Sequence, residues 1–295
     1  MLAPNQLEEL SKLLNVAQLP AMPHSALSVL QLDNDLAKVD IADLVRPIEA
    51  DPGLASQVLK FLNSSYFGFQ NTVSNVRQGI SLVGIRVVKN FVLWKAVFSL
   101  IPKSKNSLFD VAQLWQDSLR RAMFARFVVM ELRTGDPEEA FAGALLQDMA
   151  IPVMMKVKPQ DYTEFFVEMK KHESLRLSGI EKKAFGWTHA DAAGVLGRKW
   201  KLPESLCSLM ESHIQLEGDA QKAEATAIAI SALLPMAFRE AGPEKEQLLV
   251  AIAKYFPGQN QLLPTVFAKL DKEYNQYASI LQLATPKRSL MSYLE

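Results

Sequence analysis

The sequence has few of the residues that mark several large classes of protein. It contains a single cysteine, Cys207, in 295 residues, so no internal disulfide can form. This excludes a disulfide-stapled secreted domain and favours a reducing compartment, the cytoplasm by default. The 32 basic and 32 acidic side chains cancel. Without a net positive charge the chain has no long-range field to attract polyanions, and we expect no nucleic-acid partner.

Segments typical of export or membrane insertion are also missing. The amino terminus carries Glu8 and Glu9 and lacks the basic start and apolar block of a secretory signal. The most apolar stretch, residues 82–101, contains Arg86, Lys89 and Lys95. Burying three cations in lipid would cost several kcal/mol. We therefore expect no membrane span and a cytoplasmic protein.

The pattern of apolar residues predicts helices along the chain. Apolar residues recur at spacings of three and four, as in Leu7, Leu10 and Leu14, and strand-like runs are scarce. Aspartate followed by proline, at Asp51 and again at Asp136, is typical of a helix N-terminus. Short loops join these segments and no flexible linker is present. The predicted fold class is all-α, a multi-helix architecture of two packed helical bundles with a C-terminal helical extension.

The chain divides into blocks at polar or composition-changing segments. Residues 1–18 form a leading amphipathic helix, and residues 19–105 form a first bundle that ends in the polar stretch IPKSKNS at 101–107. Residues 107–215 form a second bundle, which includes a long helix from about Leu108 to Arg133. From residue 216 to 295 the sequence changes to an alanine-rich helix and further helices broken by Gly-Pro and Pro-Gly pairs.

Several kinds of chemistry lack their usual motifs. The sequence contains no nucleophile elbow, no P-loop and no dinucleotide-binding glycine motif. Cys207 lies between Leu206 and Leu209, at a position typical of a packed helix face rather than of a reactive thiol. Gly194 and Gly197 interrupt a helical pattern, where small residues favour close helix packing.

Asp148 is unusual because it follows the strongly apolar segment FAGALLQ at 141–147. A buried carboxylate requires a partner, and a helix cap, a backbone amide or an arginine could each provide it. His189 and His213 follow later in the chain. A buried polar network and a metal site are both compatible with these three residue types.

Motifs in a fixed order carry a resemblance to the HDOD domain. In the first half they are LPAMP at 19–23, IEADPGL at 48–54, LNSSYFG at 62–68 and GISLVG at 79–84. In the second half they are LW at 114–115 with Ser118, FAGALL at 141–146, THAD at 188–191 and WKLP at 200–203. The chain therefore resembles this family over about residues 19 to 215, leaving both ends as extensions.

The second half of an HDOD domain resembles the HD and HD-GYP metal-dependent phosphohydrolases. In those relatives histidines and aspartates hold metal ions that activate water on a phosphoester. Here the defining His-Asp pair is Gln147-Asp148, and Asp117 stands where the relatives have their first histidine. The resemblance leaves Asp148, His189, His213 and Asp117 as vestigial metal candidates. A glutamine is a weak ligand, so we predict no catalytic residues, no enzyme activity and no cofactor.

The resemblance implies a bacterial signal-transduction protein that regulates another signalling protein through protein contacts. The alternative is residual phosphodiester hydrolysis with a divalent metal such as Mn, Fe, Mg or Zn. A third possibility is nucleotide recognition without catalysis, in which Arg120, Arg121 and Arg126 of the long helix would contact phosphate. One face of that helix is expected to be solvated in any case. Partner identity, oligomeric state and the role of residues 216–295 stay open.

Overall fold

The computed structural model describes residues 2–32, 38–102, 108–172, 174–216, 222–234, 244–258, 262–281, 283–286 and 288–294. Within these ranges the regular structure is entirely helical, which confirms the predicted fold class. The helices of the first part of the chain are α1 (Pro4–Val16), α2 (His24–Leu30), α3 (Ile41–Glu49), α4 (Pro52–Leu62), α5 (Val76–Val83) and α6 (Ile85–Leu100). The central helices are α7 (Val111–Leu132), α8 (Pro137–Leu146), α9 (Ile151–Val157), α10 (Pro159–Lys171), α11 (Leu177–Phe185), α12 (His189–Lys199) and α13 (Glu204–Ser212). The last part forms α14 (Ala223–Ser231), α15 (Glu244–Tyr255), α16 (Leu262–Leu281) and the 3-10 turn η2 (Met291–Tyr293).

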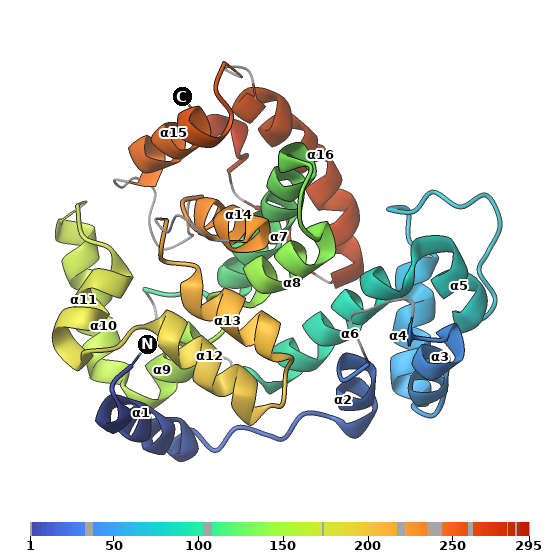
Figure 1. The fold of residues 1–295 in the computed structure, drawn as a ribbon, viewed down its shortest axis with the longest axis horizontal. Helices are drawn as coiled ribbons and strands as arrows, with labels where there is room; N and C mark the ends of the chain where they lie inside the picture. Colours follow the sequence, from blue (N-terminus) through green and yellow to red (C-terminus); the bar gives the residue numbers. More distant parts are fainter. Residues whose placement is uncertain are drawn as a thin grey trace.

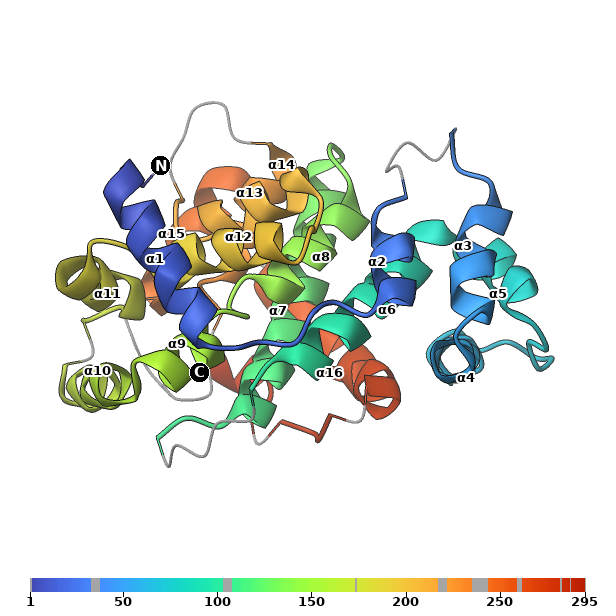
Figure 2. The same ribbon diagram turned by 90° about the horizontal axis from the view of Figure 1, so that it is seen from below.

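The helices are arranged around α7 (Figure 1). Helices α8, α14 and α16 pack directly on α7, and α13 packs on both α8 and α14. Helices α3, α4 and α5 lie together at one end of the molecule, while α10 and α11 lie at the opposite end (Figures 1 and 2). Helix α6 contacts α2, α4 and α5 on one side and α8 on the other, so it joins the first bundle to the centre.

Helix α7 is covered around most of its circumference. It begins after Asp110, whose carboxylate accepts a hydrogen bond from the Ala112 amide, and ends at Arg133 in the left-handed conformation. Its bounds are slightly shorter than the predicted helix from Leu108 to Arg133. The expectation that this helix has a solvated face is wrong for Arg120 and Arg121, which are 9% and 3% exposed. The reason is that α8, α14 and α16 enclose α7 from several directions.

The predicted helix starts are confirmed. The Asp51 carboxylate accepts a hydrogen bond from the Leu54 amide at the start of α4, and the Asp136 carboxylate accepts from the Glu138 and Glu139 amides at the start of α8. In both helices proline occupies the first turn, where its missing amide hydrogen costs nothing. Each cap satisfies amides that have no partner within the helix.

Glycines on α12 allow close contact with α13. A Cβ atom placed on Gly197 would lie 2.8 Å from the Met210 side chain and 2.9 Å from the Cys207 sulfur. Any side chain at Gly197 would therefore push the two helices apart. Cys207 is fully buried in this contact and burial raises the pKa of its thiol to about 11, which confirms a packing role.

Aromatic side chains join the first bundle to the central helices. The aromatic motif at 66–69 closes a local core, as Tyr66 and Phe67 pack edge-to-face with ring centroids 5.0 Å apart. Tyr66 also packs edge-to-face against Tyr277 of α16, at 4.6 Å. Its hydroxyl accepts a hydrogen bond from Arg126 of α7 at 3.3 Å. Tyr66 and its neighbours therefore pack the segment that follows α4 against α7 and α16.

The segments on either side of the two bundles are helical, as expected. Helix α1 packs on α9 and α12, and α16 packs along α7. The main-chain carbonyl of Arg288 accepts a hydrogen bond from Arg120 of α7 at 2.5 Å, which holds the last segment in place. The division into separate bundles at residues 105 to 107 stays a prediction, and residues 103–107 lie outside the described ranges.

One stretch, Pro137–Val157, is long and apolar enough to cross a membrane by length and composition alone. Its most apolar window is 89% buried inside the protein. The hydrophobicity of this stretch is therefore accounted for by the protein core, in which α8 packs on α7, α13 and α14.

Candidate functional site

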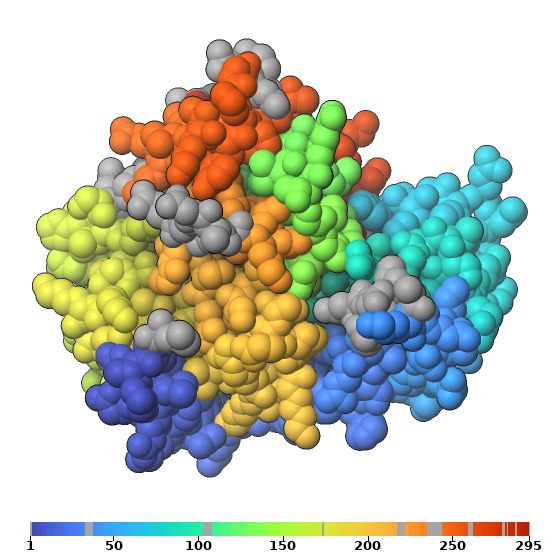
Figure 3. All heavy atoms as spheres, in the orientation of Figure 1, coloured from blue at the N-terminus to red at the C-terminus, as the bar shows by residue number. Residues whose placement is uncertain are grey.

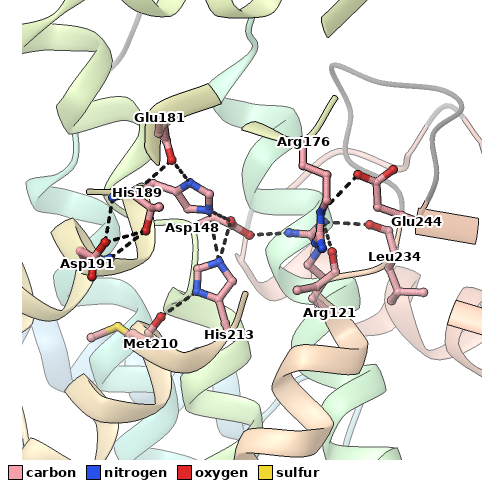
Figure 4. Close-up of polar contacts among 12 residues, drawn as sticks. Arg121, Asp148, Arg176, Glu181, His189, Asp191, Met210, His213, Leu234 and Glu244 are labelled. Atoms are coloured by element: carbon pink, nitrogen blue, oxygen red, sulfur yellow. Dashed lines mark hydrogen bonds and ion pairs between the residues drawn. The ribbon is translucent and has the colours of Figure 1, made fainter. Parts of the chain in front are cut away.

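Three of the four residues singled out in the sequence lie together in the protein interior. Asp148, His189 and His213 each direct a ligand atom toward the same point, within 4.8 Å of one another (Figure 4). The distances are 3.2 Å between the two histidine Nε2 atoms, 3.5 Å from His189 Nε2 to Asp148 Oδ1, and 3.7 Å from His213 Nε2 to the same oxygen. All three side chains are between 2% and 7% exposed.

Each of the three residues sits at the end of a helix. Asp148 lies in the turn between α8 and α9, His189 is the first residue of α12, and His213 directly follows α13. The position of His189 is fixed by a capping box in which the Thr188 hydroxyl and the Asp191 carboxylate each accept from the other residue's backbone amide. Because α12 packs on α13 and α13 packs on α8, the three helix ends lie close together and their side chains meet.

The partner of Asp148 is Arg121, from the centre of α7. Arg121 Nη1 donates to Asp148 Oδ2 at 2.5 Å, and both side chains are 3% exposed or less. Arg121 Nη2 donates to the main-chain carbonyls of Ala232 and Leu234, at 3.2 and 2.8 Å. Of the three partners that the sequence left open for Asp148, the structure shows an arginine. Arg121 therefore supplies a fixed positive charge beside the cluster.

Both histidines are oriented through their Nδ1 atoms. His213 Nδ1 lies 2.6 Å from the main-chain carbonyl of Met210, and His189 Nδ1 lies 2.6 Å from Glu181 Oε2. Glu181 is fully buried and also accepts from the His189 amide at 2.8 Å and from the Tyr162 hydroxyl at 2.5 Å. A carbonyl oxygen only accepts, so the proton of His213 is on Nδ1 and its Nε2 lone pair faces the cluster.

The two histidines differ in their affinity for a second proton. Burial lowers the pKa of His213 to about 4, so this ring is neutral. Burial also opposes charge on His189, but the Glu181 carboxylate outweighs it and the pKa of His189 is raised. Burial would raise the pKa of the Asp148 carboxyl, but Arg121 and the histidines hold it below its usual value. Without a metal ion, the Nε2 lone pair of His213 can accept a hydrogen bond from His189 Nε2, which lies 3.2 Å away.

The donor set also fits one divalent metal ion. Bonds of about 2.0 to 2.2 Å place neighbouring ligand atoms about 3.0 to 3.5 Å apart, close to the distances found here. Histidines that bind metal usually donate their other ring N–H to a carboxylate or a main-chain carbonyl, as His189 and His213 do. The cluster can therefore exist as a polar network or hold a single ion through two imidazoles and one carboxylate.

Other predicted site residues lie apart from this cluster. Asp117 is buried on α7 and acts electrostatically on Arg120, and it does not belong to the three-residue group. Gln147 is fully buried, and neither of its amide atoms has a hydrogen-bond partner within the described ranges. Arg120 and Arg126 bind within the protein, to Asp271 and Glu138 respectively. The three arginines proposed for phosphate contact therefore each pair with a carboxylate of the same chain.

Sequence reasoning missed Glu181 and Tyr162 and assigned Arg121 to another role. Glu181 lies in the segment IEKK at 180–183, which reads as a solvated helix face. Its spacing of eight residues from His189 matches no metal or catalytic motif. A useful signal in the sequence is the helical spacing of Tyr162 with the apolar residues Phe165, Phe166 and Met169, because it predicts a buried phenol that requires an acceptor.

The chain resembles solved bacterial proteins over almost its whole length. A Marinobacter aquaeolei protein assigned to signal transduction is 20% identical, with a TM-score of 0.74 over 98% of this chain and 65% of that one. An HDOD domain protein of unknown function from Geobacter sulfurreducens is 18% identical, with a TM-score of 0.69 over 95% and 99%. A Shewanella amazonensis protein assigned as a phosphohydrolase is 15% identical, with a TM-score of 0.65 over 98% of each chain. At these identities the likeness establishes the fold alone.

A relative in Treponema pallidum, an uncharacterized protein, is 22% identical over 204 residues. That match takes in 68% of this chain and only 38% of the relative, so the chain spans well under half of that protein. The HDOD domain itself matches residues 19–216, which include Asp148, His189 and His213 and leave α1 and α14 to α16 outside. This match covers more than half of the chain, which therefore belongs to the HDOD family.

Proposed function

We propose that this HDOD protein is a non-catalytic regulatory module that acts in signal transduction through contacts with another protein. The observation that carries the proposal is the buried ion pair between Arg121 and Asp148, at 2.5 Å. A phosphohydrolase uses the aspartate of its His-Asp pair to hold metal, whereas this aspartate is neutralised by a side chain of the same protein. The regulatory function needs no cofactor.

The remaining donors also argue against hydrolysis. Metal-assisted hydrolysis requires an ion with an open position for water and access for the phosphoester. Gln147 contributes no ligand atom to the cluster, and Asp117 lies outside it. Asp148 and His213 are each 2% exposed and His189 is 5% exposed, so a phosphodiester has little access to the ligand atoms.

For the contact with a partner, the structure offers a groove between α1 and the pair α12–α13. Its volume is about 760 Å³, and its lining combines apolar Leu7 and Val195 with the charged Arg198 and Glu211. Leu7 is 45% exposed, which is high for a leucine on a helix. Apolar surface framed by charge is typical of protein contact sites. The partner is another signalling protein, and no nucleic acid or membrane is required.

A phosphodiester assay tests the non-catalytic proposal. Full-length protein is incubated with bis-(p-nitrophenyl) phosphate and Mn²⁺ or Fe²⁺, beside the Asp148→Ala and His189→Ala variants. We expect release of nitrophenol at the buffer rate in all three samples. Turnover in the unaltered protein that disappears in both variants would overturn the proposal.

The second candidate function is residual metal-dependent phosphodiester hydrolysis. It is favoured by the convergence of His189 Nε2, His213 Nε2 and Asp148 Oδ1 on one point. In that case the ion would lower the pKa of its bound water, and Glu181 would hold His189 in the ligating orientation. The same assay separates the two functions, because only this candidate expects turnover that depends on the added metal.

A further inference from the structure

The first bundle contains a cavity that lies between α2, the start of α4 and the second half of α6. Its volume is about 520 Å³, and none of its lining residues belongs to the cluster of Asp148, His189 and His213. Helix α6 packs on both α2 and α4, so the three helices form the walls. Figure 3 shows the first bundle, in blue to teal, at the surface at one end of the molecule. A cavity of this size accommodates a small organic molecule.

Lys95 brings one positive charge to this cavity. Its side chain is partly buried, and no carboxylate within the described ranges pairs with it. Its Nζ instead lies 5.5 Å from the centroid of the Trp94 ring. Burial lowers the pKa of this ammonium. By contrast, Arg86 near the start of the same helix pairs with Asp136 at 2.8 Å. Lys95 is therefore a cation in a cavity wall to which a ligand can supply the missing anion.

Aromatic surface lies next to this charge. The rings of Trp94 and Phe98 pack with their centroids 4.2 Å apart, and Phe98 packs in turn on Trp115 at 3.7 Å. Phe98 is only partly buried, and it lines the cavity together with Leu54 of α4. Rings that are packed in this way offer a large apolar contact area at a fixed position. The cavity therefore combines one cation with an aromatic wall.

Asp51 limits the charge that a ligand can carry. It is the single acid among the lining residues, as Lys95 is the single base. Its carboxylate accepts from the Leu54 amide at 3.0 Å and from the Ser25 hydroxyl at 2.8 Å. These bonds lower the pKa of Asp51, so the carboxylate is ionised at neutral pH. The lining is therefore neutral overall, which disfavours a polyphosphate and favours a ligand with a single negative charge.

We infer that this cavity binds a small monocarboxylate with an aromatic body. The carboxylate of the ligand pairs with Lys95, and its ring packs against Phe98. The ligand then contacts α6, the helix that joins the first bundle to the centre, where Asn90 donates to Glu138 of α8 at 2.9 Å. The inference does not rest on the proposed regulatory function, because the cavity belongs to the first bundle alone.

Titration of the full chain with phenylacetate tests this site. Isothermal calorimetry measures the affinity, and phenylacetamide serves as a neutral probe with the same ring. We expect one equivalent of phenylacetate to bind with a Kd below about 1 mM, and phenylacetamide to bind at least about tenfold more weakly because it cannot pair with Lys95. The absence of phenylacetate binding up to about 10 mM, or equal affinities for the two probes, would overturn the inference.

Variants assign the binding to Lys95. Lys95→Met keeps an aliphatic side chain and removes the charge, so it is expected to weaken phenylacetate binding at least about tenfold and to leave phenylacetamide binding unchanged. The matched control is Lys60→Met, which removes an exposed lysine of the neighbouring helix α4 and is expected to bind like the unaltered protein. An unchanged affinity for phenylacetate in Lys95→Met contradicts the assignment.

A second measurement uses the unaltered protein and does not depend on the folding of Lys95→Met. The indole ¹⁵N–¹H resonance of Trp94 is identified by its loss in Trp94→Phe, and it is expected to shift on saturation with phenylacetate. The resonance of Trp187, which is fully buried in the second bundle, is the control and is expected to stay in place. A bound probe that leaves the Trp94 resonance unmoved would place the ligand elsewhere and overturn the inference.

Discussion

Asn63 in the first bundle and Arg121 in the second satisfy their polar groups in different ways, Asn63 by bonds to the backbone at the surface and Arg121 by a charge pair in the interior. Asn63 is exposed and both donates to and accepts from the backbone of Val73, at 2.8 and 2.7 Å. Arg121 and Asp148 are buried and bind each other. Burying a charge pair has a large desolvation cost, and packing of the fold does not require one. The pair therefore needs a reason other than packing, and it lies beside the candidate site formed by Asp148, His189 and His213.

The largest loss of stability is expected from removal of Arg121. Arg121→Ala leaves the Asp148 carboxylate buried without its cation, and the free energy of unfolding should fall by about 3 to 5 kcal/mol. In the first bundle, Arg46 pairs with Asp43 at 2.9 Å but its side chain is 76% exposed. Arg46→Ala should change the free energy of unfolding by no more than about 0.5 kcal/mol. Urea denaturation measures both, and similar losses in the two variants would contradict the distinction.

Acid should weaken the second bundle before it affects the first. Unfolded histidine binds a proton near pH 6.5, while burial holds the pKa of His213 at about 4 in the folded protein. The unfolded state therefore binds more protons between these values, and stability falls as the pH falls from 6.5 to 4, by about 3 kcal/mol at most. The raised pKa of His189 acts at higher pH, where its stabilising charge is lost as the pH rises through the folded value. Asp51 has a lowered pKa, so its contribution is lost only at pH below its usual 3.8.

This pH dependence is measured by urea denaturation with a chelator present, at several values between about pH 7 and pH 4. The His213→Gln variant removes the titrating ring and should lose most of the slope in this range. A slope of equal size in the variant would show that another group is responsible.

Loss of a helix cap in the first bundle should have an intermediate effect. Asp51 accepts from the Leu54 amide at 3.0 Å and from the Ser25 hydroxyl at 2.8 Å. Asp51→Ala removes both bonds and should lower the free energy of unfolding by about 1 kcal/mol. Ser25→Ala removes only the second bond and serves as the control, with a smaller loss. Thermal unfolding followed by circular dichroism ranks the two variants, and the reverse order would contradict the capping role.

The same contrast explains which features could be predicted from the sequence. The caps at Asp51 and Asp136 bond to amides two or three residues away, so a short motif contains the whole interaction. The all-α class follows from the spacing of apolar residues for the same reason. Asp148 could be identified as needing a partner because an acid in an apolar segment is unusual.

Local sequence patterns do not identify the partner of Asp148. Arg121 and Asp148 are 27 residues apart, and the carbonyl of Leu234 that fixes Arg121 is 113 residues from it. The sequence leaves Arg121 as a candidate phosphate contact or as part of a solvated helix face, and neither applies to a helix enclosed by α8, α14 and α16. Glu181 looked like an ordinary surface charge because its partners Tyr162 and His189 come from other segments. The resemblance to HDOD domains pointed to His189 and His213, but composition and spacing did not.

The smallest expected difference in stability between the bundles concerns two glutamines, one exposed and one buried. Gln78 is exposed on α5 and its side-chain oxygen accepts from the Ser74 amide at 3.2 Å. Gln147 is fully buried beside Asp148 in the sequence, and its amide has no hydrogen-bond partner in the described part of the chain. A buried amide without a partner destabilises a protein, so an apolar side chain of similar volume should be tolerated there.

Gln147→Met should therefore leave the free energy of unfolding unchanged or raise it by up to about 1 kcal/mol, whereas Gln78→Met should lower it by about 0.5 kcal/mol. Urea denaturation of the chelator-treated protein measures both changes. A loss of more than about 1 kcal/mol in Gln147→Met would contradict this expectation, because the amide would then contribute more to stability than a methionine of similar volume.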